Sequence, residues 1–336
     1  MEKNIFGKLT TGEEIYSYKL ENSKIYAEII TYGARLRAFG RIGRDNIVGS
    51  FDTIEDYTLD DSFQGAIIGR IADRTANARF TIDGVEYKLP KNAGNDCIHS
   101  GGVFSRSAWK VEKSCKDSIT LSYFSPDGEC GFPGDLRVYV TYSLDGEALI
   151  IDYKAYPEKK TPISMTNHAY FNLYGMGGNI YSHEVTLYAD KYSAIDKNLL
   201  PTGEHPSVDG TPLDLRKPKI LGNMIQGDFL GYDHNFCLSP LKYREFLGKN
   251  LGLAAEVKAN GLCLSVYTDM HDLVFYTANE LAGFPNFRCG IKRINHGALC
   301  LEAETEPNAV NFGLGIYDAG EVYKQTTVYE LKEVLK

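Results

Sequence analysis

The chain has 336 residues, a formal net charge of −8 and a pI near 5.5. No cluster of five or six basic residues occurs, so the charge pattern argues against nucleic acid and anionic membrane surfaces as partners. The N-terminal stretch MEKNIFGKLTTGEE lacks the apolar core of a signal peptide, and no apolar run reaches the length of a membrane span. The seven cysteines are scattered without a CxxC pair, which favours a cytoplasmic protein with reduced thiols.

The elements predicted along the chain are almost all β-strands. Residues 80–89 alternate around an Asp-Gly pair, a strong signal for a hairpin. A longer hairpin is predicted over 136–156, with Asp145-Gly146 at its tip, and another over 254–268, around an Asn-Gly pair. Further strands are predicted at residues 24–33, 119–124, 183–189, 273–279 and 298–304.

Helix signals are scarce, and the best amphipathic candidate is the short segment 241–249 (LKYREFLGK). Strands at regular spacing with turn residues between them favour a large antiparallel sandwich or barrel over alternating βαβ units. No tandem repeat, low-complexity linker or composition boundary divides the chain. We therefore expect an all-β protein in which residues 1–336 form one domain.

Motifs for common cofactors are absent from the sequence. It contains no GxxxxGK[ST], no GxGxxG between a strand and a helix, no HExxH and no GxSxG. The seven histidines show no metal-ligand spacing, and the glycine-rich segment 175–178 is interpreted as a turn. We expect neither a cofactor nor a metal.

A histidine stands in the middle of a strand-like segment, ISMTNHAYFNL (163–173). Asn167 and His168 lie side by side there, among β-forming and aromatic residues. A lone histidine in such a place is most often a hydrogen-bonded structural residue. The alternative is that a rigid strand holds a proton donor in place.

Four other segments place a charged or titratable side chain in a strand-like or turn-like context. They carry Arg74, His99, Asp233 and Glu302. Each has a structural interpretation of its own: an ion-pair partner, a loop cap, a turn former and a solvent-facing strand residue, respectively. Taken singly, none of the four indicates a function.

Taken together and in chain order, these segments resemble the aldose 1-epimerase (galactose mutarotase) family. The resemblance rests on GRIADR, IHSGG with a Trp ten residues after the His, SPDGECGFPGDLRVYVTYSL, TNHAYFNL, GYDHNF and CLEAETEPNAVN. It extends from about residue 25 to the C-terminal strands. It implies a single large antiparallel β-sandwich that interconverts the α and β anomers of a free monosaccharide, a galactose- or glucose-type hexose or a related sugar.

The resemblance also implies a role for each site residue. Glu302 would be the base that takes the anomeric hydroxyl proton, and His168 the acid that protonates the ring oxygen from the opposite side of the sugar. Arg74 and His99 would contact the ring-oxygen side, and Asp233 would bind sugar hydroxyls. This chemistry favours an ionised Glu302 near its ordinary pKa and a His168 whose pKa is raised by nearby acids.

Two positions depart from the family pattern. Asp73 replaces the usual Asn before the substrate-binding Arg74, and Val274 replaces a common Gln. Because a polar site rejects ligands that leave its groups unpaired, we expect a sugar preference shifted away from plain galactose. Four aromatic residues could line the pocket or pack in the core: Tyr170, Phe171, Tyr232 and Phe236.

Three other functions remain open from the sequence: a glycosidase, a non-catalytic sugar-binding protein, and an epimerase of a modified sugar such as a deoxy sugar, a pentose or a hexose 6-phosphate. A phosphate-binding site would need clustered arginines. Arg35, Arg37, Arg41 and Arg44 are close in sequence, but alternation along a strand makes surface charges an equal interpretation. The oligomeric state is expected to be a monomer or a homodimer.

Overall fold

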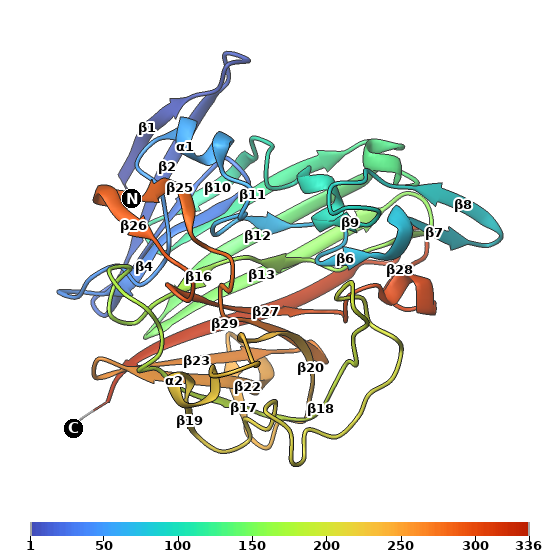
Figure 1. Ribbon diagram of the computed structural model, residues 1–336. Coiled ribbons are helices and arrows are strands. Elements are labelled where there is room, and N and C mark those ends of the chain that lie inside the picture. Colours follow the sequence, from blue (N-terminus) through green and yellow to red (C-terminus); the bar gives the residue numbers. More distant parts are fainter. Residues whose placement is uncertain (1, 335–336) are drawn as a thin grey trace.

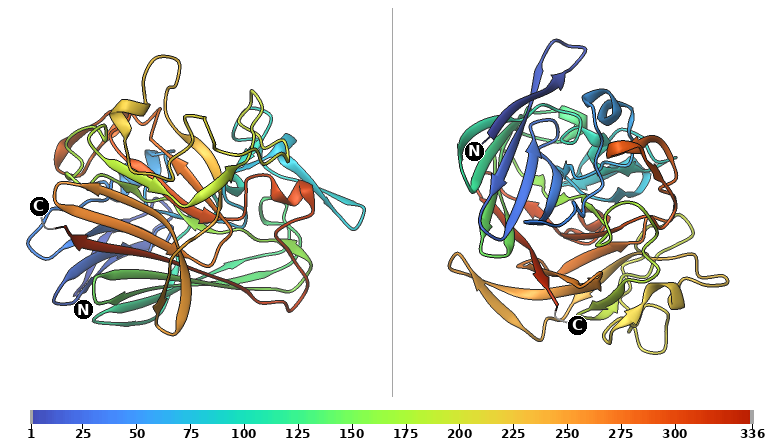
Figure 2. Two further views of the ribbon diagram at one scale, coloured as in Figure 1. Left: turned by 90° about the horizontal axis from the view of Figure 1, so that it is seen from below. Right: turned by 90° about the vertical axis from the view of Figure 1, so that its left-hand side faces the viewer.

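The computed structural model describes residues 2–334, and its secondary structure is dominated by antiparallel β-strands (Figure 1). The largest sheet has ten strands. In spatial order they are β10 (Lys110–Cys115), β11 (Ser118–Ser125), β12 (Leu136–Asp145), β13 (Ala148–Pro157), β29 (Tyr323–Glu333), β23 (Leu262–Thr268), β22 (Lys249–Ala259), β17 (Glu184–Leu187) and β19 (Lys219–Ile220), with β21 (Tyr243–Phe246) pairing to β22. The late strand β29 lies in the middle of this sheet, between β13 and β23, as both views in Figure 2 show.

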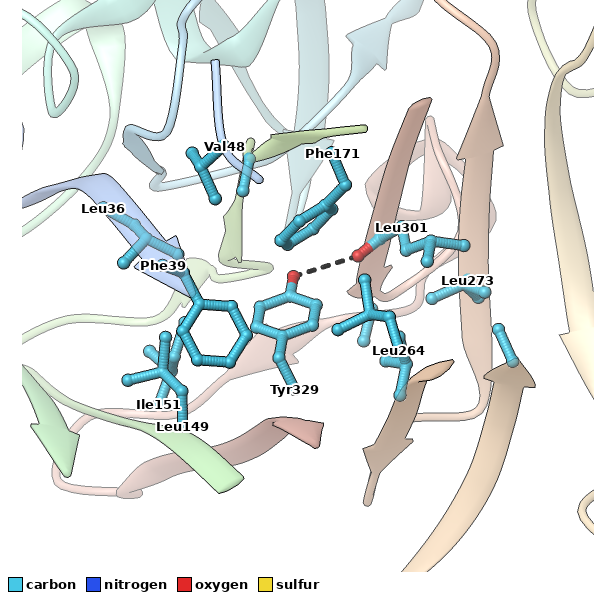
Figure 3. Close-up of a cluster of buried hydrophobic side chains, with 14 of the residues drawn as sticks. Leu36, Phe39, Val48, Leu149, Ile151, Phe171, Leu264, Leu273, Leu301 and Tyr329 are labelled. Atoms are coloured by element: carbon cyan, nitrogen blue, oxygen red, sulfur yellow. Dashed lines mark hydrogen bonds between the residues drawn. The ribbon is translucent and has the colours of Figure 1, made fainter. Parts of the chain in front are cut away.

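A second sheet of five strands packs against the first. Its order is β16 (Tyr170–Phe171), β27 (Leu299–Glu304), β24 (Asp272–Tyr276), β20 (Asp233–Leu238) and β18 (Ala189–Tyr192). Tyr329 of β29 shows how the two layers meet. Its ring lies 4.9 Å from that of Phe171, and its hydroxyl donates to the Leu301 carbonyl over 3.0 Å (Figure 3). The largest apolar cluster therefore lies between the two sheets, and the expectation of an all-β antiparallel sandwich is confirmed.

The remaining elements are short and surround these two layers. A four-stranded sheet contains β1 (Glu2–Lys8), β2 (Glu14–Glu21), β3 (Ile25–Ile30) and β4 (Arg35–Arg41). Two-stranded pairs are β5 (Ile67–Ile68) with β15 (Thr166–Asn167), β6 (Arg74–Thr75) with β9 (Cys97–Ile98), β7 (Arg79–Ile82) with β8 (Val85–Lys88), β14 (Thr161–Pro162) with β28 (Ile316–Tyr317), and β25 (Gly283–Phe287) with β26 (Ile291–Arg293). The helices are α1 (Ile54–Leu59) and α2 (Leu221–Met224), with 3₁₀ turns η1 (Ala76–Ala78), η2 (His99–Gly102), η3 (Glu129–Gly131), η4 (Arg288–Gly290) and η5 (Ala309–Phe312).

The three predicted hairpins are present. At the Asn-Gly hairpin, Asn260 and Gly261 both have positive φ (51° and 71°), as a two-residue turn between twisted strands requires. In the hairpin of β12 and β13, Asp145 pairs with Ala148, so the tip lies one residue later than predicted. Across residues 2–334, no helix combines the length and the apolar character that crossing a membrane would need.

The best helix candidate of the sequence, residues 241–249, is not helical. This segment forms β21 and the first residue of β22, joined by a turn at Leu247 and Gly248 with φ of 47° and 79°. Only Phe246 is buried, in a small cluster with Leu251, whereas Leu241 stays exposed. The apolar residues of the segment therefore do not form one buried face, as they would in a helix packed on the core.

The interpretation of the early arginines as surface charges is also wrong for two of them. Arg35 is buried, and its guanidinium donates to the carbonyls of Tyr32 and Ser105. Arg37 is buried as well and forms an ion pair with Glu28 at 2.8 Å. Because both guanidinium groups already have partners inside the protein, they do not form a phosphate-binding cluster.

Candidate active site

The outer face of the five-stranded sheet carries the polar residues, because strand side chains alternate between its two faces. Along β27, Leu299, Leu301 and Ala303 belong to the core, whereas Glu302 points to the opposite side. Next to it in register on β24 is Val274. Both line a cavity of about 550 Å³ above this face.

His168 lies in the link between β15 and β16, not in the middle of a strand as expected. Its backbone is nevertheless held on both sides. The His168 amide donates to the Ala66 carbonyl (2.9 Å), and its carbonyl accepts from the Gly65 amide (2.8 Å). The neighbouring Asn167 is buried and donates to the Gly65 carbonyl, so it anchors this link and does not face the cavity.

His168 and Glu302 are neighbours at the bottom of the cavity. His168 Nε2 lies 3.8 Å from Glu302 Oε2, and the residues are only 6% and 4% exposed. We expected Glu302 and His168 on opposite sides of the sugar. Two groups placed in that way would lie farther apart than 3.8 Å, so this expectation is wrong for this structure. The interpretation of Glu302 as a solvent-facing strand residue is wrong too.

Burial sets the protonation of this pair in the direction opposite to the one expected. It raises the pKa of Glu302 well above its ordinary value, and the nearby carboxylates of Asp73 and Asp233 raise it further. Burial also lowers the pKa of His168 to about 4. Because burial disfavours both charges, a proton shared by the pair resides on Glu302 and the imidazole is neutral.

His99 forms two hydrogen bonds with the backbone of Asp73. The Asp73 amide donates to His99 Nδ1, and the His99 amide donates to the Asp73 carbonyl, both over 3.0 Å. Burial lowers the pKa of His99 well below its usual value. Since Nδ1 accepts, the neutral ring carries its proton on Nε2 and can act there as a donor. Phe63 packs its ring edge-to-face on His99 with centroids 4.7 Å apart.

Asp233, the first residue of β20, has a pKa near neutral pH. Burial raises its pKa to about 7, with a further contribution from Asp73 and an opposing one from Arg74. Asp73 itself has a raised pKa for the same main reason, burial, partly offset by Arg74. The carboxyl groups of Asp73 and Asp233 and the guanidinium of Arg74 all belong to residues that line the cavity.

The structure brings all of the predicted site residues to this one cavity. The lining includes Asp73, Arg74, His99, His168, Asp233, Val274 and Glu302. Of the four aromatic candidates, Tyr170 lines the cavity, and Phe171, Tyr232 and Phe236 pack in the core. Sequence reasoning missed Phe63, which no motif indicates, and Tyr276, which strand alternation from Val274 would have placed on the same face.

One group among residues 2–334 combines three types of metal-binding side chain. A nitrogen of His168, the sulfur of Cys300 and a carboxylate oxygen of Glu302 lie within 4.8 Å of one another, all in buried residues. Nitrogen, sulfur and oxygen donors of this kind suit zinc. An ion there would be bound by the same two side chains, His168 and Glu302, that form this pair.

Comparison with known proteins shows the family of this chain. The family model "Aldose 1-epimerase" matches residues 16–330. The galactose mutarotase of Sus scrofa is 39% identical over 97% of this chain and 96% of its own length, and the aldose 1-epimerase of Escherichia coli K12 is 35% identical over 76% and 75%. The solved structure of galactose 1-epimerase from Lactobacillus acidophilus has a TM-score of 0.86 at 27% identity and covers 99% of both chains. The chain belongs to the aldose 1-epimerase family.

Proposed function

We propose that this protein interconverts the α and β anomers of a free aldose, with Glu302 and His168 as its proton-transfer pair. The observation that supports this most directly is the 3.8 Å separation of the two groups at the bottom of a polar cavity. The anomeric hydroxyl oxygen and the ring oxygen of a sugar are bonded to the same carbon. A base and an acid that are themselves neighbours can therefore reach both oxygens of one bound sugar.

The reaction needs one proton removed and one delivered. The Glu302 carboxylate takes the proton of the anomeric hydroxyl, and His168 Nε2 gives a proton to the ring oxygen. The bond between the anomeric carbon and the ring oxygen breaks, and its electron pair goes to the ring oxygen while the carbonyl of the open-chain aldehyde forms. After rotation about the bond between carbons 1 and 2, the same transfers run in reverse and close the ring as the other anomer.

The pair carries one proton throughout this cycle. In the closed-ring state the proton is on His168, and in the open-chain state it is on Glu302. No net charge enters or leaves the buried pair, because the proton only changes its position. Burial raises the pKa of Glu302 and lowers the pKa of His168, so without a sugar the pair holds its proton on Glu302 and must move it to His168 before the ring can open.

The other cavity residues are suited to hold the sugar. The Nε2–H of His99 and the guanidinium of Arg74 would donate to the ring-oxygen side, where negative charge develops during opening. Asp233 would bind sugar hydroxyls. Asp73 and Val274, which supply an acceptor and an apolar surface, would shift the preference away from plain galactose.

The function is tested by following anomer exchange of freshly dissolved α-galactose, glucose, arabinose, xylose and fucose by polarimetry or NMR. We expect acceleration with every sugar that binds, and a preferred sugar other than galactose. Methyl glycosides, in which the anomeric oxygen is blocked, should not react. A sugar-binding protein would bind an aldose without accelerating exchange, a glycosidase would cleave the methyl glycosides, and either result would overturn the proposal.

A further inference from the structure

Cys300 lies directly behind the proposed acid. It is on β27, two residues before Glu302 and therefore on the same face of the sheet, and it is fully buried. Its sulfur lies 3.7 Å from His168 Nδ1. The other ring nitrogen, Nε2, is the one that lies 3.8 Å from the Glu302 carboxyl oxygen. The imidazole thus stands between a thiol and a carboxyl group.

The proposed cycle requires one particular tautomer of His168. The protonated ring carries hydrogen on both nitrogens and gives up the one on Nε2. The neutral ring that remains must keep its hydrogen on Nδ1, so that the lone pair on Nε2 can take the proton back when the sugar ring closes. Which nitrogen of a histidine keeps its hydrogen is decided by the hydrogen bond that this nitrogen makes.

We propose that Cys300 is a positioning residue: its sulfur accepts a hydrogen bond from Nδ1–H of His168 and keeps that hydrogen in place throughout the cycle. This inference rests on the proposed role of His168 as the acid. Among the described residues, the Cys300 sulfur is the side-chain partner that the structure gives to Nδ1, at 3.7 Å. The thiol does not contact the sugar cavity itself.

A thiol differs in its effect from a carboxylate at the same place. Burial raises the pKa of Cys300 well above its ordinary value, so the group stays neutral. The other polar groups against the His168 ring are its own backbone carbonyl, Glu302, the edge-on ring of His99 at 5.1 Å and the stacked ring of Tyr170 at 5.0 Å. A neutral partner on Nδ1 orients the imidazole without stabilising its positive charge, so His168 gives up its proton readily.

The wild-type protein provides the first test, because the imidazole ¹⁵N shifts of His168 report its tautomer without any assay of activity. We expect the Nδ1–H tautomer at neutral pH in the wild type. In Cys300→Ala, which removes the acceptor, we expect the Nε2–H form to appear. The Nε2–H tautomer in the wild type, or an unchanged tautomer in the variant, would overturn the proposal.

Kinetics provides the second test. We expect Cys300→Ala to lower kcat about tenfold and to change KM less than twofold. Tenfold is only a part of the rate enhancement that a well-positioned general acid contributes. Cys300→Ser, which keeps an acceptor, should recover most of the loss. Cys263→Ala removes a buried thiol in β23 of the other sheet and is the matched control, expected to behave like wild type. Wild-type kcat in Cys300→Ala would contradict the role of Cys300, whereas wild-type activity in His168→Asn would contradict the proposed function instead.

Discussion

At the scale of single residues, Asp233 couples the site to the stability of the protein. Its pKa of about 7, raised mainly by burial, means that the folded protein binds this proton more tightly than the unfolded chain does. The sign follows from linkage. The stabilising effect of the bound proton is complete below the ordinary pKa of an aspartate, and it is lost as the pH rises through about 7.

Asp233→Asn should therefore stabilise the protein increasingly as the pH rises. An amide cannot ionise, so the variant avoids the cost of a buried charge, and we expect its Tm advantage over wild type to grow by roughly 2–4 °C between pH 5 and pH 8. Thermal unfolding at the two pH values measures this difference. A Tm difference that is the same at both would show that Asp233 titrates normally in the folded protein.

The positions of the polar residues could be predicted from the sequence, but their protonation could not. Arg74, His99, His168 and Glu302 come from separate motifs, and all of them reach one cavity. Their pKa shifts depend on burial by segments far away in the chain, which no motif contains. Phe63 is a similar case, because it contacts His99 only through the tertiary fold.

At the scale of elements, strand alternation and register determine which side chains line the cavity. Val274 pairs with Glu302 across β24 and β27 and presents an apolar surface beside the proposed base. The hairpins and the alternation along β27 were predictable because they are local. The break of the strand-like segment 163–173 into β15 and β16 was not, since these strands pair with β5 and β27, which are distant in sequence.

Asp73→Asn combined with Val274→Gln should move the sugar preference toward galactose. Each change restores an amide that can donate to a hydroxyl, and one hydrogen bond contributes about 0.5–1.5 kcal/mol. We expect the ratio of kcat/KM for galactose to that for the best wild-type sugar to rise about tenfold. Val274→Leu, which enlarges the apolar side chain without adding a donor, is the control. An unchanged ratio in the double variant would show that these positions do not select the sugar.

At the scale of the whole molecule, Arg70 connects two of the sequence motifs. Its side chain is fully buried and donates to the carbonyls of Ser125 (2.9 Å), Pro133 (3.0 Å) and Gly134 (2.8 Å). The GRIADR segment, which carries Asp73 and Arg74, is thereby fixed to the SPDGECGFPGD loop. One role of that loop motif is therefore to hold a wall of the cavity in place.

Arg70→Met should destabilise the protein by at least about 3 kcal/mol, because several buried carbonyls lose their donor at once. Arg79→Met removes an exposed ion pair with Glu86 and should cost less than about 0.5 kcal/mol. Urea unfolding of the two variants and the wild type compares them directly. Equal stability of both variants would show that the buried guanidinium is not important for the fold.

The central claim is that Glu302 and His168 act together as one proton-transfer pair, and a double-mutant cycle of anomer exchange tests it most directly. The rates of wild type, Glu302→Gln, His168→Asn and the double variant are measured on the preferred aldose, with folding checked by circular dichroism. We predict that each single variant loses at least about 100-fold in kcat and that the double variant loses little more, because either change interrupts the same transfer. A folded single variant that exchanges anomers within a few-fold of the wild-type rate would contradict the account.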